Sequence, residues 1–368
     1  MQMSEAAWLI ALLAAAAYLL ALWPPVWRFR KLKAPPVLPP QPLPVSILVP
    51  ARNEENHILQ CLAALQAQTL AAEIIVINDH STDRTAALAA SVQGVRVLHL
   101  VEGQQGKKAA LEAGIAAANG SLILTTDADC TPPPQWCAHL AAALQGQTEF
   151  CFGPILLQGG KGWLTALQNI ESIAVQSVSA GLLSRGIAFT ASGASLGYCR
   201  HVPEAAGGYA QDHTPSGDDV LLLLRTHGRN PSAVAWLHSR DALVPAAAAT
   251  TFGQFLSQRI RWASKYGSYT TWPVRMLGGA IAAAAVLPWS MAAAAVFFPV
   301  LYLPLLGFLA IKFAGDFLLL SLALPFFRKP ELLRWFVVVW PLYQLCIPVI
   351  ATGALRRKFS WKGRTYTT

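Results

Sequence analysis

The sequence is poor in charged residues. Lys, Arg, Asp and Glu make up only 13% of its 368 residues, whereas hydrophobic residues make up 54%. An average soluble domain carries about 25% charged residues. A charge content this low excludes an intrinsically disordered chain and a protein whose whole surface faces water. We therefore expect part of the chain to lie in lipid, while its length leaves room for a water-soluble domain with its own core.

The sequence also lacks the cysteine and histidine patterns of common metal and disulfide sites. Its six cysteines are scattered without a C-x-x-C pair, and none of its eight histidines forms an H-E-x-x-H motif. These absences argue against a zinc site and against a disulfide framework. We expect reduced, mostly buried thiols in a domain that faces the cytosol.

Long apolar stretches near both ends of the chain predict membrane helices. The first stretch has no basic residue before it, which favours a retained membrane anchor over a cleaved signal peptide. In the C-terminal part, Lys312 and Asp316 are four residues apart, so they share a helical face and are expected to form an ion pair inside a helix bundle. The expected membrane segments are residues 6–23, 278–298, 299–324 and 335–355.

The basic residues beside these stretches leave the topology partly open. Those at 28–33 place the N-terminus outside and the following chain in the cytosol, because cytosolic flanks are rich in Lys and Arg. The clusters at 328–334 and 356–364 both favour the cytosol as well. Either 335–355 is a re-entrant or interfacial segment, or the charge rule fails at one end.

Between the apolar ends, short β-rich runs alternate with helical stretches. The runs VSILVP, EIIVIND, VRVLHL and SLILTTD are typical of buried parallel strands. This alternation predicts an α/β fold with a doubly wound, mostly parallel sheet that binds ligands at the C-terminal ends of its strands. The expected domains are a membrane anchor at 1–27, a basic and Pro-rich linker at 28–44, a cytosolic α/β domain at 45–250, an interfacial amphipathic helix at 251–275 and a C-terminal membrane domain with a basic tail at 276–368.

Polar motifs follow the predicted strands. A D-x-D pair at a strand end presents carboxylate oxygens to a hard divalent cation, Mg²⁺ or Mn²⁺, together with substrate phosphates. Taken singly, each motif also fits a helix cap, a turn or, for the last one, an interfacial helix. The five motifs are P-A-R-N-E at 50–54, N-D-H-S-T-D at 78–83, D-A-D at 127–129, D-D at 218–219 and Q-R-I-R-W at 258–262.

In this order, the five motifs resemble glycosyltransferase family 2 over residues 45–265. The family comprises inverting enzymes of the GT-A fold, so the resemblance implies that fold here. The flanking apolar segments are similar to its membrane branch, which includes ceramide glucosyltransferase-like and polysaccharide synthase-like enzymes. The resemblance implies a membrane-bound, metal-dependent enzyme that moves a sugar from a nucleotide donor, expected to be UDP, to a hydroxyl group of a lipid acceptor.

The resemblance also implies roles for individual residues. Asp129 is expected to bind Mg²⁺ or Mn²⁺ together with Asp127. Asp219 is the expected general base, and Asp218 stays an alternative because the family's usual Glu-Asp pair is Asp-Asp here. The expected nucleotide contacts are Ala51, Arg52, Glu54, Asp79, Asp127 and either Lys107 or Lys108, and the residues expected to close over the diphosphate and acceptor are Gln258, Arg261 and Trp262.

Two other functions fit parts of the sequence. A processive polysaccharide synthase would use the same chemistry but would need more membrane helices for a channel. A catalytically dead membrane scaffold is disfavoured by the intact D-A-D, D-D and Q-R-I-R-W motifs. The net charge of +9 does not indicate nucleic-acid binding, because much of it flanks the apolar segments, where it meets anionic lipids. We expect an integral protein of the cell inner membrane with its catalytic domain in the cytosol.

Overall fold

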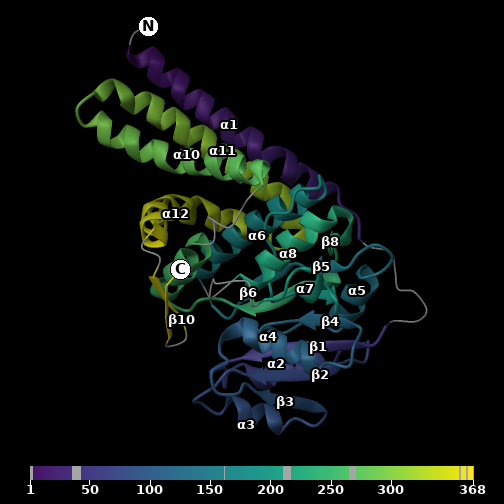
Figure 1. Ribbon diagram of the computed structural model, residues 1–368. Coiled ribbons are helices and arrows are strands. Elements are labelled where there is room, and N and C mark those ends of the chain that lie inside the picture. Colours follow the sequence, from purple (N-terminus) through teal and green to yellow (C-terminus); the bar gives the residue numbers. More distant parts are fainter. Residues whose placement is uncertain are drawn as a thin grey trace. The chain divides into compact units, whose positions relative to one another are not determined.

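The computed structural model describes residues 3–34, 43–160, 162–209, 217–264, 271–355, 358–361 and 364–367 (Figure 1). Residues 35–42 of the expected linker at 28–44 lie outside these residues, and residues 28–31 belong to the first helix, which ends at Lys31. The chain divides into two compact units, each built from separate segments. The helical unit comprises Met1–Lys31, Lys161–Ile187 and Thr251–Arg356, and the α/β unit comprises Leu32–Gly160, Ala188–Thr250 and Arg357–Thr368.

The α/β unit is built on a seven-stranded sheet in the order β3-β2-β1-β4-β7-β5-β8. Neighbouring strands from β3 to β4 are parallel, β7 runs antiparallel to both β4 and β5, and β8 is parallel to β5. This arrangement confirms the predicted mostly parallel sheet. The strands are β1 (Val45–Ala51), β2 (Glu73–Asn78), β3 (Val95–His99), β4 (Leu122–Thr125), β5 (Phe150–Phe152), β7 (Leu196–Cys199) and β8 (Val234–Trp236).

The core of the α/β unit explains the unbroken apolar runs of the sequence. Ile47, Leu48 and Val49 of β1 are all fully buried, as expected for a central parallel strand covered on both faces. Two smaller sheets pair β6 (Ile155–Gln158) with β9 (Val244–Ala247) and β10 (Lys358–Trp361) with β11 (Arg364–Thr367). The helices of the unit are α2 (Ile58–Gln66), α3 (Thr85–Ala90), α4 (Gly106–Ala117), α5 (Trp136–Ala143), α7 (Val202–Ala205) and α8 (Asp218–Arg229).

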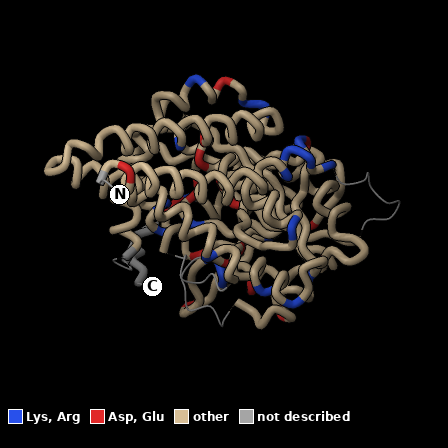
Figure 2. The backbone as a smooth tube through the Cα atoms, turned by 90° about the horizontal axis from the view of Figure 1, so that it is seen from above, with Lys and Arg blue, Asp and Glu red and all other residues tan. Residues whose placement is uncertain are grey.

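The helical unit contains the predicted membrane helices. Its members are α1 (Met3–Lys31), α6 (Trp163–Leu183), α9 (Phe252–Ala263), α10 (Trp272–Ala295), α11 (Tyr302–Phe327) and α12 (Leu332–Leu355). Among the described residues, α1, α10, α11 and α12 are long and apolar enough to cross a membrane, which confirms one N-terminal and three C-terminal candidates. Figure 2 shows long helical stretches with few charged residues. The described helix α12 continues through both of its prolines.

The helices of this unit pack against one another in a connected bundle. Helix α1 runs beside α10 and α11 (Figure 1), while α12 packs against α6 and α9. Helix α6 also packs closely against α1, at Gly181. A Cβ atom at Gly181 would lie only 1.8 Å from the carbonyl oxygen of Pro25, so glycine is required for this approach.

A buried polar cluster joins three membrane helices. Lys312 Nζ lies 2.7 Å from a carboxylate oxygen of Asp316, which confirms the predicted ion pair. The Asp316 carboxylate also accepts hydrogen bonds from the Tyr18 hydroxyl at 2.7 Å and from the Trp340 indole at 2.8 Å. Asp316 is therefore satisfied by groups from α1, α11 and α12, as expected for a charge that holds a bundle together.

We expect Asp316→Leu to lower the free energy of unfolding by about 3–5 kcal/mol, because it leaves Lys312 buried without its counter-ion. The double variant Lys312→Leu/Asp316→Leu removes both charges and should lose clearly less. Thermal unfolding of the detergent-solubilised protein would measure both. Equal losses in the single and double variants would show that the ion pair does not matter for stability.

Candidate active site

The loops that follow β1 and β2 are joined by hydrogen bonds. Arg52 donates to the carbonyl oxygen of Asp79 at 2.8 Å, and its guanidinium lies 4.0 Å from the Asp79 carboxylate. The Asp79 side chain is buried and accepts a hydrogen bond from the backbone N–H of Gly106, the first residue of α4, at 3.1 Å. The Glu54 backbone N–H donates to the Thr85 hydroxyl at 2.7 Å. Three of the expected nucleotide contacts thus lie on two loops that support each other.

Both loops contain a strained residue. Asn53 and His80 have φ angles of 51° and 52°, a left-handed conformation that few residues other than glycine adopt. The strain is held by tertiary contacts, since the Asn53 side chain accepts a hydrogen bond from the backbone N–H of Thr82 at 2.8 Å and His80 contacts the carbonyl of Gln104 at 2.8 Å. Strain held in this way is typical of ligand-binding loops.

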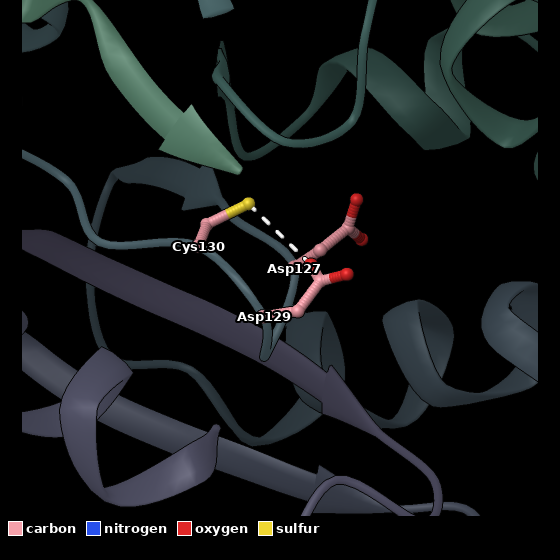
Figure 3. Close-up of side chains that lie close together, drawn as sticks. All are labelled: Asp127, Asp129 and Cys130. Carbon is pink, nitrogen blue, oxygen red and sulfur yellow. Dashed lines mark hydrogen bonds between the residues drawn. The ribbon is translucent and has the colours of Figure 1, made fainter. Parts of the chain in front are cut away.

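The loop after β4 carries the D-A-D motif. The possible ligand atoms of Asp127, Asp129 and Cys130 all lie within 4.8 Å of one another (Figure 3). Cys130 is fully buried, and its thiol donates to an Asp129 carboxylate oxygen at 3.6 Å. Burial, together with the nearby carboxylates, raises the pKa of this thiol well above its usual value, so it stays neutral and binds metals weakly. The two carboxylates are the donors that fit Mg²⁺ or Mn²⁺.

Lys107 connects the D-A-D motif to the D-D motif. Its Nζ lies 2.5 Å from a carboxylate oxygen of Asp127 and 3.7 Å from one of Asp218. Burial alone would lower the pKa of Lys107, but the neighbouring carboxylates outweigh this effect and raise it, so the side chain stays charged. Of the two candidate lysines, the structure brings Lys107 to these motifs.

The two carboxylates of the D-D motif have different surroundings. Helix α8 begins at Asp218, directly after Gly217 in a left-handed conformation, so both acidic side chains lie at its positive end. Asp218 is buried and faces Lys107, whereas Asp219 is partly exposed. Asp219 accepts hydrogen bonds from the backbone N–H groups of Gly193 at 3.0 Å and Val220 at 2.8 Å. Asp219 is therefore the more accessible carboxylate of the pair.

Gly193 is a site residue that the sequence analysis did not identify. Its N–H donates to Asp219, and a Cβ atom at this position would lie 2.7 Å from Lys107 Nζ and 3.6 Å from an Asp218 carboxylate oxygen. The lack of a side chain at Gly193 therefore allows Lys107 to approach both motifs. The only sequence signal is a glycine in the short run S-G-A-S, which is too common to be informative.

The remaining predicted site residues belong to the helical unit. Gln258, Arg261 and Trp262 lie on α9, which starts with a capping box formed by Thr251 and Gln254. Gln258 and Arg261 are partly exposed, and the Trp262 side chain is 44% exposed.

Comparison with known proteins relates part of the chain to glycosyltransferases. Residues 46–200 match the family model for glycosyl transferase family 2. The chain is 28% identical over 260 residues to "Probable glycosyltransferase YdaM" of Bacillus subtilis, covering 65% of this chain and 57% of that protein. It is 36% identical over 111 residues to the undecaprenyl-phosphate 4-deoxy-4-formamido-L-arabinose transferase of Aeromonas hydrophila, covering 28% of this chain and 34% of that one. The chain thus spans little more than half the length of the first of these relatives.

A solved structure has the same fold. The mannosyltransferase PcManGT from Pyrobaculum calidifontis, in complex with GDP-Man and Mn²⁺, aligns with a TM-score of 0.60 and 19% identity over 92% of this chain and 99% of that one. At this identity the likeness concerns the fold alone. It confirms the predicted GT-A-like architecture.

Proposed function

Residues 46–200 belong to glycosyltransferase family 2, and from this premise we propose that the chain is a membrane-bound inverting glycosyltransferase with a nucleotide-sugar donor and a lipid acceptor. The observation that carries the proposal is the contact of Lys107 with both Asp127 and Asp218. Through this contact, the carboxylates suited to a metal–diphosphate group lie beside a carboxylate pair suited to proton transfer. The four apolar helices support a membrane location.

The donor side uses the loops after β1, β2 and β4. Arg52, Asp79 and their neighbours Ala51 and Glu54 bind the nucleotide, for which UDP is our expectation. Asp129 and Asp127 would hold Mg²⁺ or Mn²⁺, and the cation would supply positive charge to neutralise the diphosphate leaving group. Lys107 keeps its positive charge beside Asp127 and adds to this neutralisation.

The acceptor side uses Asp219. As general base, it removes the proton from the acceptor hydroxyl while that oxygen attacks the anomeric carbon, and a single displacement inverts the configuration there. Asp218, paired with Lys107, is less suited to this role because it is buried. An accessible carboxylate favours a hydroxyl acceptor over a lipid phosphate, since a phosphate oxygen is already ionised and needs no base.

For the motif on α9 we propose the roles that the family resemblance implies. Arg261 forms charge-assisted hydrogen bonds to the diphosphate, and Gln258 assists it. Trp262 offers an exposed apolar face to the acceptor. The basic residues that end α1 (Arg28, Arg30 and Lys31) favour an orientation in the cell inner membrane that keeps the catalytic domain in the cytosol.

The proposed function is tested by incubating membranes that contain the protein with a panel of UDP- and GDP-sugars and analysing lipid extracts by mass spectrometry. We expect one added sugar on a membrane lipid. A long polymer would instead indicate a processive synthase. Absence of any donor turnover, with every sugar and metal supplied, would contradict an enzymatic role.

Gly193→Ala is expected to lower transfer by about 10²-fold, because small displacements of catalytic groups have effects of this size. The new methyl group would displace Lys107 Nζ, which is the end of a flexible side chain, so thermal stability should change little. Gly228→Ala on α8 is the matched control, because nothing lies within 4 Å of its added Cβ. Equal transfer rates for both variants would show that the close approach of Lys107 to Gly193 is not needed for transfer.

A further inference from the structure

Arg259, the second residue of the Q-R-I-R-W motif, is buried in the helical unit. Its Nε lies 2.5 Å from one carboxylate oxygen of Glu171 on α6. The other carboxylate oxygen of Glu171 accepts a hydrogen bond from the Tyr343 hydroxyl of α12 at 2.8 Å. Glu171 therefore connects the interior of α9 to two further helices.

The same guanidinium contacts two neighbouring residues of the motif. Arg259 Nη1 donates to the side-chain oxygen of Gln258 at 3.0 Å. The guanidinium carbon lies 4.4 Å from the centre of the Trp262 ring and 4.5 Å from that of Phe255, so the planar cation is stacked on two aromatic rings. The Arg259 guanidinium therefore helps to fix the orientation of the Gln258 and Trp262 side chains.

We propose that Arg259 is a positioning residue for glycosyl transfer, fixed by Glu171 and Tyr343. It holds the Trp262 indole by stacking and occupies the Gln258 side-chain oxygen, which leaves the Gln258 amide hydrogens to meet a substrate oxygen. This inference rests on the proposed function, in which Gln258 and Trp262 meet the substrates. In this proposal the buried ion pair of Arg259 and Glu171 serves substrate positioning as well as stability.

Arg259→Lys is the first test. Lysine retains a positive charge for Glu171 but loses both the planar group that stacks on Trp262 and the bond to Gln258. We expect kcat for transfer to fall by about 10²-fold. The KM for the nucleotide sugar should change much less than kcat, because the loops after β1, β2 and β4 that bind the nucleotide are untouched. A normally folded variant with wild-type kcat would overturn the proposal.

The double variant Glu171→Arg/Arg259→Glu separates positioning from stability. It restores a pair of opposite charges. Helix α9, however, no longer carries an arginine that stacks on Phe255 and Trp262. We expect it to recover the unfolding temperature lost in Glu171→Ala without recovering transfer. Recovery of transfer to near the wild-type rate would show that the pair is only structural. If the swapped chain does not fold, Arg259→Lys decides the question alone.

Two controls complete the design. The exposed pair of Lys329 and Glu331, 3.4 Å apart, can be swapped in the same way, and transfer should not change. The wild-type protein distinguishes the two hypotheses. If it forms no glycolipid with any donor, the proposed function fails, whereas an active wild type with an unaffected Arg259→Lys variant refutes only the positioning role.

Discussion

Asp219→Asn is expected to lower sugar transfer by about 10²–10⁴-fold, the usual effect of removing a general base. Asparagine keeps the shape of the side chain and can still accept one of the two backbone hydrogen bonds, from Gly193 or from Val220, but it cannot take a proton from the acceptor. Affinity for the nucleotide sugar should change little, because Asp79, Arg52 and Asp129 remain. Radiolabelled transfer and donor binding, measured on the same preparation, would test both expectations.

Asp218→Asn is the matched comparison. It removes the charge that faces Lys107, so we expect a smaller loss of transfer and an increase in the KM for the donor. If Asp218→Asn abolishes transfer and Asp219→Asn does not, the base is assigned to the wrong member of the pair. Wild-type rates in both variants would show that the D-D motif only stabilises the start of α8 and takes no part in proton transfer.

Removal of divalent cations is expected to abolish transfer, and Mg²⁺ or Mn²⁺ should restore it. The proposed ligands are two carboxylates, so a cation should bind weakly without substrate phosphates and exhaustive EDTA treatment should extract it. Asp129→Asn should lower transfer by about 10³-fold, because a metal contributes several kcal/mol of charge stabilisation. Asp127→Asn should cost less. Transfer rates across a metal titration would measure these effects.

Cys130→Ser tests the metal ligands independently. Serine can still donate to Asp129, and the neutral thiol is not expected to bind the cation, so the metal dependence should persist. Loss of Mg²⁺ activation in this variant would assign the thiol as a ligand. Full activity of the wild type after complete chelation would contradict the metal site altogether.

The fold followed from local patterns in the sequence. The apolar run of β1, the alternation of strands and helices, and the long apolar stretches each depend on residues close together in the chain, and all are confirmed. The spacing of Lys312 and Asp316 likewise identified their ion pair. The family resemblance, which rests on short motifs, is confirmed as well.

The unpredicted features depend on contacts between distant residues. Arg259 is 88 residues from Glu171, and Tyr343 is 172 residues from it, so no local pattern indicates that they meet. The role of Gly193 depends on the space that Lys107 occupies, which only the folded chain defines. The sequence does not distinguish Lys107 from Lys108 for the same reason. Their side chains point to different sides of one helix, and only the folded chain shows which side faces the two acidic motifs.

The assignment of α6 to the helical unit limits how the protein can be engineered. Residues 161–187 interrupt the α/β unit in the sequence, so no single cut of the chain separates the two units. A fragment of residues 45–250 would carry α6 without its partner helices and would expose the face that packs against α1 and α12. A water-soluble form of the protein therefore requires an internal replacement of this segment. Chimaeras with known glycosyltransferases require matched junctions on both sides of it.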